Sequence, residues 1–315
     1  MKNRFISGFF IVVIIALAFA LRELNLYLFD VLIAGMTVVA AHEIGKLFSK
    51  AGKKNYVIVG MIYPVLSYLT LLIGFLNDFA LIKHLIAQLL LIVVTAVVIM
   101  VVQLCMRNKM VYDMKVSKYN GSIYSFMFKR MMDTVTTFVY PTLFCMMLII
   151  MSRIKGFSDL AFVDTFKDVN LGLIILLATI ISSCLSDVFA LFIGTIIGGK
   201  KLAPKISPNK TIAGAIGGVF GALLSMVIYF IVLKSFGEIS IAFSAANVTV
   251  WTFLIYGLIA SVVSQLGDLF ESYLKRQADE KDSGTIFPGH GGVMDRLDSI
   301  TVNAMFTLIF FIIIL

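Results

Sequence analysis

The sequence predicts an all-α polytopic integral membrane protein. Of its 315 residues, 60% are hydrophobic and 14% are charged, whereas ordinary soluble domains contain roughly 45–50% and about 25%. Apolar runs recur along the whole length, and many reach the ~20 helical residues that cross a hydrocarbon core of about 30 Å. These observations predict one integral domain without a separate soluble part.

Hydropathy indicates nine successive spans. They are expected at residues 5–21, 28–45, 56–76, 83–106, 134–152, 171–197, 213–233, 249–270 and 299–315. The first run follows Lys2 and Arg4, as a signal peptide would. No small-residue cleavage site followed by a soluble chain appears, so we expect a retained helix. The expected organisation is an N-terminal part, 1–170, with about five helices, and a C-terminal transmembrane part, 171–315, which carries the motif loops.

Basic residues are distributed unequally between the two sides of this arrangement. The N-terminus and the loops at 46–55, 107–133, 198–212 and 271–298 contain 20 of the 26 Lys and Arg residues. The positive-inside rule places these segments in the cytoplasm. The N-terminus is then expected to be cytoplasmic, and the C-terminus, after an odd number of spans, is expected outside.

The net charge of +8 does not indicate nucleic-acid binding. The basic residues are spread among the loops of a membrane protein, which points to topology and to contact with anionic lipid of the bilayer. Cys105, Cys145 and Cys184 lie in or at the ends of apolar segments without metal-ligand spacing. A structural role is therefore expected for all three cysteines.

Small residues gather in two neighbouring spans. They are Gly194 and Gly198 in one span, and Gly214, Gly217, Gly218 and Gly221 in the next. Spacing of this kind lets helix backbones approach closely. Tight packing within the chain is the favoured interpretation, and a homodimer face is the alternative.

The segment from Gln265 to Ser299 is the most polar part of the C-terminal half. On a helix, Asp268, Ser272 and Lys275 fall at i, i+4 and i+7, so they line one face where the eighth span leaves the membrane. The sequence then continues with Lys281, Asp282, Gly284 and Pro288-Gly-His-Gly-Gly292, which predicts a close-fitting loop. Glycines without Cβ let backbone N–H groups approach phosphate oxygens.

Asp295, Arg296 and Asp298 end this loop, just before the last span. Carboxylates beside cations and glycines make a metal-phosphate site plausible, and hard oxygen ligands suit Mg²⁺, which takes one or two protein carboxylates and completes its shell with water and substrate oxygens. The alternative is a solvated hairpin loop whose Lys and Asp residues balance charge.

Ionisable residues lie within two of the expected spans. Asp187 stands inside the sixth span, where an ionisable side chain costs ~2.5–3.5 kcal/mol and usually faces a cavity or partner, so a functional role is expected. His42 and Glu43 lie near the cytoplasmic end of the second span. We expect both to be interfacial residues that reach water.

A resemblance to a known family rests on two stretches. The first consists of Ser272, Leu274, Lys275, Arg276, Lys281, Asp282, Gly284, Phe287, Pro288, His290, Gly291, Gly292, Asp295, Arg296 and Asp298, and the second of Ser186, Asp187, Ala190, Gly194, Gly198, Ile206, Ser207, Pro208, Lys210, Thr211 and Gly214. The first stretch resembles the phosphatidate cytidylyltransferase signature in residue types and spacing, and the second supports it. Ala213 stands where the family usually has an acidic residue.

The resemblance implies an enzyme that joins CTP and phosphatidate to give CDP-diacylglycerol and pyrophosphate, with Asp268 and Asp295 holding Mg²⁺. It makes 171–315 the catalytic region. The residues to which it gives a catalytic or substrate-binding role are Asp187, Ser207, Lys210, Thr211, Asp268, Ser272, Lys275, Arg276, Lys281, Asp282, His290, Gly291, Gly292, Asp295, Arg296 and Asp298. For His290 two roles stay open, donation to a phosphate and pinning of the turn.

The implied chemistry is physically coherent. Phosphatidate already carries a phosphate monoester with a second pKa near ~6, so no strong base is needed, and the demand is for cations around two anions. The expected location is the cytoplasmic membrane of a prokaryote, with the site facing the cytoplasm. A CTP-dependent lipid kinase acting on a polyprenol or diacylglycerol, and a non-catalytic transporter, are the alternatives.

Overall fold

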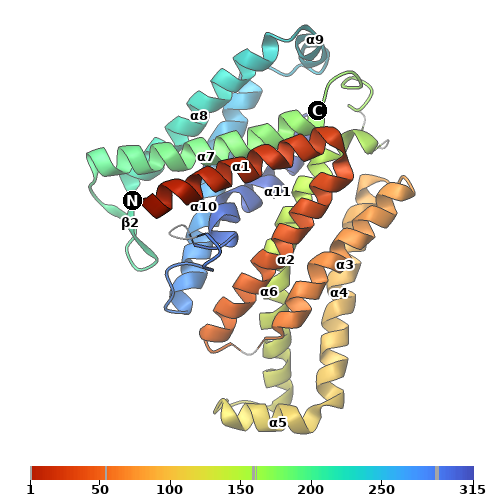
Figure 1. The fold of residues 1–315 in the computed structure, drawn as a ribbon, viewed down its shortest axis with the longest axis vertical. Helices are drawn as coiled ribbons and strands as arrows, with labels where there is room; N and C mark the ends of the chain where they lie inside the picture. Colours follow the sequence, from red (N-terminus) through yellow and green to blue (C-terminus); the bar gives the residue numbers. More distant parts are fainter. Residues whose placement is uncertain (1, 54, 158–159, 161, 288–290) are drawn as a thin grey trace.

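The protein is an assembly of long helices with one small β-hairpin (Figure 1). The computed structural model describes residues 2–53, 55–157, 160, 162–287 and 291–315, with the backbone alone for 2–12 and 144. Its elements are α1 (Lys2–Leu24), α2 (Leu26–Lys50), α3 (Val57–Leu76), α4 (Leu81–Cys105), α5 (Arg107–Val116), α6 (Ile123–Ser152), η1 (Ile154–Gly156), α7 (Leu171–Ile197), β1 (Lys201–Ala203), β2 (Ser207–Thr211), α8 (Ile212–Lys234), α9 (Gly237–Ala245), α10 (Val250–Gln277) and α11 (Met294–Ile314).

The helices confirm the predicted fold class. Within the described part of the chain, eight helices are long and apolar enough to cross a membrane, namely α2, α3, α4, α6, α7, α8, α10 and α11. Each corresponds to one predicted span, and α1 occupies the position of the first. Among the eight, α4 is the least buried by the rest of the protein, so most of its surface is available to lipid.

The segment 107–133 differs from its prediction as a loop. It forms α5 and the first turns of α6, which begins at Ile123 where the Ser122 hydroxyl accepts the Ser125 N–H at 3.1 Å. An ion pair of 2.6 Å between Arg130 and Asp113 joins the two helices. Hydropathy missed these turns because they are helical but polar.

Glycines bring α7 and α8 together, which confirms the interpretation as packing within the chain. A Cβ on Gly214 would lie 2.7 Å from the carbonyl oxygen of Ala190, and one on Gly221 would lie 2.8 Å from that of Leu185. Gly198 is different, because its φ of +63° ends α7 and nothing lies within 4 Å of its Cβ position. It terminates the helix instead of packing against a neighbour.

The polar motifs meet at one end of the bundle. Chain reversals bring together the C-terminal end of α2, the β1–β2 hairpin, the C-terminal end of α10 and the N-terminal end of α11 (Figure 1). The opposite end has its own charged network, in which Arg153 contacts buried Asp30 at 2.6 Å. A cavity of about 530 Å³ lies beside this network and is lined in part by Leu26 at the start of α2. At 1.5 Å per residue, Leu26 is about 25 Å along the helix from Glu43, which lies at the end where the motifs meet.

Candidate active site

The β1–β2 hairpin carries the first motif stretch to α10. Its two strands pair antiparallel, and Thr211 ends β2 by accepting the Gly214 N–H at 3.0 Å, which caps α8. From β2, Lys210 Nζ reaches the Asp268 carboxylate on α10 at 2.5 Å. From α10, Arg276 Nε donates to the Ile206 carbonyl at 3.2 Å. The two stretches, about 60 residues apart in sequence, thus form one cluster.

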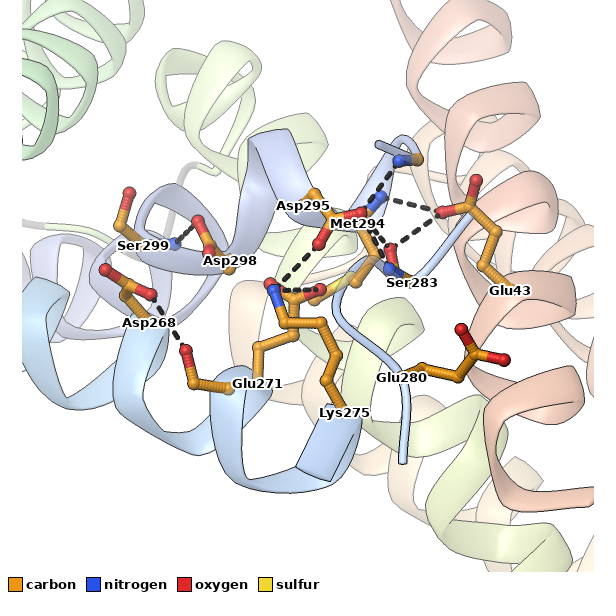
Figure 2. Close-up of polar contacts among 12 residues, drawn as sticks. Glu43, Asp268, Glu271, Lys275, Glu280, Ser283, Met294, Asp295, Asp298 and Ser299 are labelled. Atoms are coloured by element: carbon orange, nitrogen blue, oxygen red, sulfur yellow. Dashed lines mark hydrogen bonds and ion pairs between the residues drawn. The ribbon is translucent and has the colours of Figure 1, made fainter. Parts of the chain in front are cut away.

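The predicted face of α10 is present. Ser272 Oγ donates to Asp268 Oδ1 at 3.4 Å. Asp268 and Lys275 lie on the same helix, α10 (Figure 2). Glu271 also belongs to this cluster, fully buried with its carboxylate 3.6 Å from Lys275 Nζ. Glu271 was absent from the predicted site because the motif does not include it. Its position between two motif residues on an emerging span was the available signal.

Asp295 joins α10 to the loop that precedes α11. Its Oδ1 accepts a hydrogen bond from Lys275 Nζ at 2.7 Å. Its Oδ2 accepts from the Ser283 N–H and Oγ, both at 2.8 Å, and from the Gly292 N–H at 2.7 Å. Both ends of the loop are therefore held by a buried carboxylate.

Two further aspartates, Asp187 and Asp298, lie beside the Lys275–Asp295 pair. Asp187 on α7 accepts from Ser299 Oγ at 3.0 Å, and Asp298 Oδ1 accepts from the Ser299 N–H at 2.7 Å. The carboxyl groups of Asp268 and Glu271 are close neighbours of Asp298. Five carboxylates thus gather around two ammonium groups, those of Lys210 and Lys275. The cluster has an excess of acidic groups that a cation would balance.

The donor set fits Mg²⁺ in part. Among the described residues, no group of three or more His, Cys, Asp or Glu side chains could by itself hold a metal ion, but Mg²⁺ needs only one or two carboxylates when phosphates and water complete its shell. Asp268 suits this role because its side chain is 26% exposed. At Asp295, Oδ2 already accepts three hydrogen bonds and Oδ1 accepts one from Lys275, so a metal ion at Oδ1 would share that oxygen with the ammonium group. Both metal assignments stay predictions.

The loop glycines make room for carboxylates. A Cβ on Gly291, whose φ is +85°, would lie 2.4 Å from Asp295 Oδ2, and Cβ atoms on Gly284 and Gly292 would lie 2.2 and 2.3 Å from Glu43 Oε1. We expected the N–H groups of these glycines to contact phosphate oxygens. The Gly292 N–H instead donates to the Asp295 carboxylate.

The remaining predicted residues surround the cluster. Lys281, Asp282, Arg276 and Arg296 are exposed, and Ser207 is half-buried. The exposed side chains of Lys281 and Arg296 can contact an incoming anion, whereas Arg276 already donates to the backbone carbonyls of Ile206 and Glu280. Pro288, Gly289 and His290 lie outside the described residues.

An apolar cavity of about 100 Å³ adjoins the site. Arg296 is the charged residue of its lining, and the lining also includes Phe287, Val293 and residues of α1, α2, α6, α7 and α11. Apolar wall residues include Ala18, Ile33, Met36, Ile180 and Leu297. The site thus combines charged groups at the end of the helices with an apolar recess between them.

Fold and site together define a multi-pass membrane protein whose charged, carboxylate-rich centre lies at one end of its helices. Comparison with known proteins agrees with the resemblance in the motifs. The chain belongs to the cytidylyltransferase family, whose model matches residues 2–314.

Individual relatives match the chain over shorter stretches. A phosphatidate cytidylyltransferase of Rickettsia bellii is 47% identical over 127 residues, 40% of this chain and 52% of the relative. Those of Brucella abortus and Staphylococcus saprophyticus are 42% and 36% identical over 125 and 156 residues. The matched stretches span 42% and 54% of these two relatives and 40% and 50% of this chain, so the similarity covers about half of each protein.

Proposed function

We propose that the protein is a phosphatidate cytidylyltransferase, which transfers CMP from CTP to phosphatidate and releases pyrophosphate. One observation carries the proposal. The Lys210–Asp268 contact of 2.5 Å joins the two motif stretches into a single charged centre, and this centre adjoins an apolar recess. A nucleotide and a lipid phosphate need such a meeting point of charge and apolar surface.

The reaction is a displacement at phosphorus. An oxygen of the phosphatidate phosphate attacks the α-phosphorus of CTP, a new P–O bond forms, and the bond to the β-phosphate oxygen breaks as pyrophosphate leaves. The attacking phosphate is largely dianionic at neutral pH, so the protein need not remove a proton. Its task is to bring two anions together and to stabilise the charge that develops on pyrophosphate.

The chain's own cations suit that task. Lys210 and Lys275 are fixed by ion pairs to Asp268 and Asp295 at 2.5 and 2.7 Å, which orients both ammonium groups before substrate arrives. Arg276, Lys281 and Arg296 are exposed, and we assign them to phosphate contacts. Mg²⁺, which Asp268 and Oδ1 of Asp295 would hold, would neutralise phosphate charge.

The apolar recess suits an acyl chain. Its lining is almost wholly hydrophobic and includes the exposed Arg296, whose guanidinium can bind the phosphate of a lipid whose chain enters the recess. We place this end of the protein at the cytoplasmic face of a prokaryotic cytoplasmic membrane, because the basic loops lie there and CTP is a cytoplasmic nucleotide.

The test uses the full chain, purified in lipid nanodiscs and supplied with CTP, Mg²⁺ and phosphatidate. We expect CDP-diacylglycerol and pyrophosphate in equal amounts. Diacylglycerol in place of phosphatidate should give neither product, because it lacks the attacking phosphate. Product from diacylglycerol with release of CDP would contradict the proposal and favour a lipid kinase.

A further inference from the structure

We propose that Glu43 of α2 is a positioning residue for the site, because its carboxylate sets the backbone that carries Asp295 and, through Asp295, the Lys275 ammonium group. The inference rests on the proposed function. It corrects the expectation that Glu43 reaches water, since the residue is only 4% exposed. Glu43 lies in the N-terminal half, outside both motif stretches.

The carboxylate of Glu43 binds the start of α11. Oε1 accepts the Val293 N–H at 3.1 Å. Oε2 accepts the Met294 N–H at 2.9 Å and the Ser283 hydroxyl at 3.4 Å (Figure 2). The first N–H groups of a helix have no partner within it, and a carboxylate there is also favoured by the helix dipole. Glu43 therefore fixes where α11 begins.

The loop is shaped around this carboxylate. Cβ atoms on Gly284 and Gly292 would lie 2.2 and 2.3 Å from Glu43 Oε1, so a larger residue at either position would force the Glu43 carboxylate or the loop to shift. Two separate parts of the loop thus approach the Glu43 carboxylate in its present position so closely that neither leaves room for a Cβ. The glycines of the motif and a carboxylate about 240 residues away form one packed unit.

Glu43 and Asp295 hold the same backbone at adjacent points. The Gly292 N–H binds Asp295 Oδ2 at 2.7 Å, and the next N–H, that of Val293, binds Glu43. Ser283 Oγ lies within 3.4 Å of Glu43 and 2.8 Å of Asp295. Because Asp295 in turn holds Lys275 at 2.7 Å, a shift of the loop at Glu43 would displace the ammonium group that we assign to phosphate.

A second contact between α2 and the segment that joins α10 to α11 provides a matched control. Lys50 Nζ pairs with Glu280 at 2.6 Å, but these side chains are 60% and 37% exposed, so the pair is solvated and contributes little. Lys50→Met removes this link between α2 and the α10–α11 connection without altering the contacts of Asp295. A general weakening of the α2 contact would affect both variants, whereas positioning by Glu43 would affect one.

The first measurement is steady-state kinetics of Glu43→Gln, Glu43→Ala and Lys50→Met in nanodiscs. Gln keeps the shape but can accept with only one of its two terminal atoms. We expect kcat/KM for CTP to fall about 100-fold in Glu43→Ala and less in Glu43→Gln, since misplacement by 1 Å can cost about that factor. Lys50→Met should stay within about twofold of wild type. Wild-type kcat/KM in both Glu43 variants would overturn the inference.

A double-mutant cycle tests the contact itself. Gly284→Ala should lower activity in the wild type, because its Cβ meets the Glu43 carboxylate, and should add little in the Glu43→Ala background, where that carboxylate is gone. Losses that multiply in the double variant would show that the two residues act independently and would overturn the inference.

Amide hydrogen exchange gives a readout that does not depend on catalysis. Exchange at residues 291–296 should become faster in Glu43→Ala and stay unchanged in Lys50→Met. Unchanged exchange in Glu43→Ala overturns the positioning role whatever the activity is. If the wild type makes no CDP-diacylglycerol while exchange responds as expected, the proposed function fails and the hold of Glu43 on the loop stands.

Discussion

Asp268 and Asp295 look alike in the motif, but their surroundings differ. The Asp268 side chain is 26% exposed and pairs with Lys210, which is 27% exposed, whereas the Asp295 side chain is 3% exposed and holds both Lys275 and the loop. Removing charge from Asp268 leaves the packing intact. Removing it from Asp295 leaves a buried ammonium group without its closest partner.

The two Asn substitutions should therefore separate function from stability. Asp268→Asn should lower turnover by at least about 100-fold, the scale of losing one electrostatic contact in an active site, with little change in melting temperature. Asp295→Asn should lower turnover and also destabilise the fold by ~3–5 kcal/mol, the cost of breaking a buried pair. Turnover and thermal melting of the purified variants check this. Equal melting temperatures would contradict the structural role of Asp295.

Sequence reasoning proposed Asp187, Asp268, Lys275 and Lys210 as candidate site residues without showing how they meet. Helical spacing was enough for the α10 face, because Asp268, Ser272 and Lys275 lie one turn apart. Glu43 was misjudged because its partners are backbone N–H groups about 250 residues away, and no local pattern encodes such a contact. The cost of a carboxylate within an apolar span, which pointed to Asp187, applied equally to Glu43.

At the scale of elements, the α7–α8 pair supports the site. The hairpin that carries Lys210 connects these helices, so their close approach fixes the hairpin base. Glycine spacing predicted the approach. The polar helix α5 and the early start of α6 were not predicted, because hydropathy reports apolar length and these turns are stabilised by a cap and an ion pair.

Gly221→Ala tests the helix pair. Its Cβ would lie 2.5 Å from the Cβ of Phe189 and 2.8 Å from the Leu185 carbonyl oxygen, so overpacking should destabilise the protein by ~1–3 kcal/mol. Gly35→Ala is the control, because nothing lies within 4 Å of its Cβ position in α2, and Ala should stabilise a helix by ~0.5–1 kcal/mol. Thermal melting in nanodiscs compares them, and a similar response in both would contradict close packing at Gly221.

The apolar recess makes a prediction about lipid chains. Ala18→Phe on α1 fills a wall of the cavity, so KM for long-chain phosphatidate should rise about tenfold, the equivalent of roughly two methylenes at 0.8 kcal/mol each. KM for CTP should not change. Ala20→Phe, on the exposed side of the same helix, is the control. If both substitutions raised KM for long-chain phosphatidate equally, or if Ala18→Phe did not raise it, the recess would be excluded as an acyl site.

At the scale of the molecule, the charge distribution predicts an orientation. The α5 segment and the motif loops should face the cytoplasm, and the C-terminus should lie outside. A topology reporter fused after Leu315 should therefore lie outside the membrane. One inserted near Ser117, just beyond α5, should lie on the cytoplasmic side. Both reporters on one side would contradict the arrangement that gives the site access to CTP.

The whole-molecule arrangement follows from the sequence in outline. Nine predicted segments and their alternation were enough to place the motif loops at one end, because each apolar helix must cross and return. The lateral packing could not be predicted, since apolar surfaces of similar spans do not specify their neighbours. Contact between α2 and the start of α11 is an example.

Cytidylyl transfer is tested most directly by the fate of the phosphorus atoms of CTP. With phosphatidate and Mg²⁺ in nanodiscs, label from α-labelled CTP should enter the lipid, and label from γ-labelled CTP should leave as pyrophosphate. Both results should disappear in Asp268→Asn. Lipid labelled from the γ position would show phosphoryl transfer and contradict the account, and label from neither position would contradict catalysis by this site.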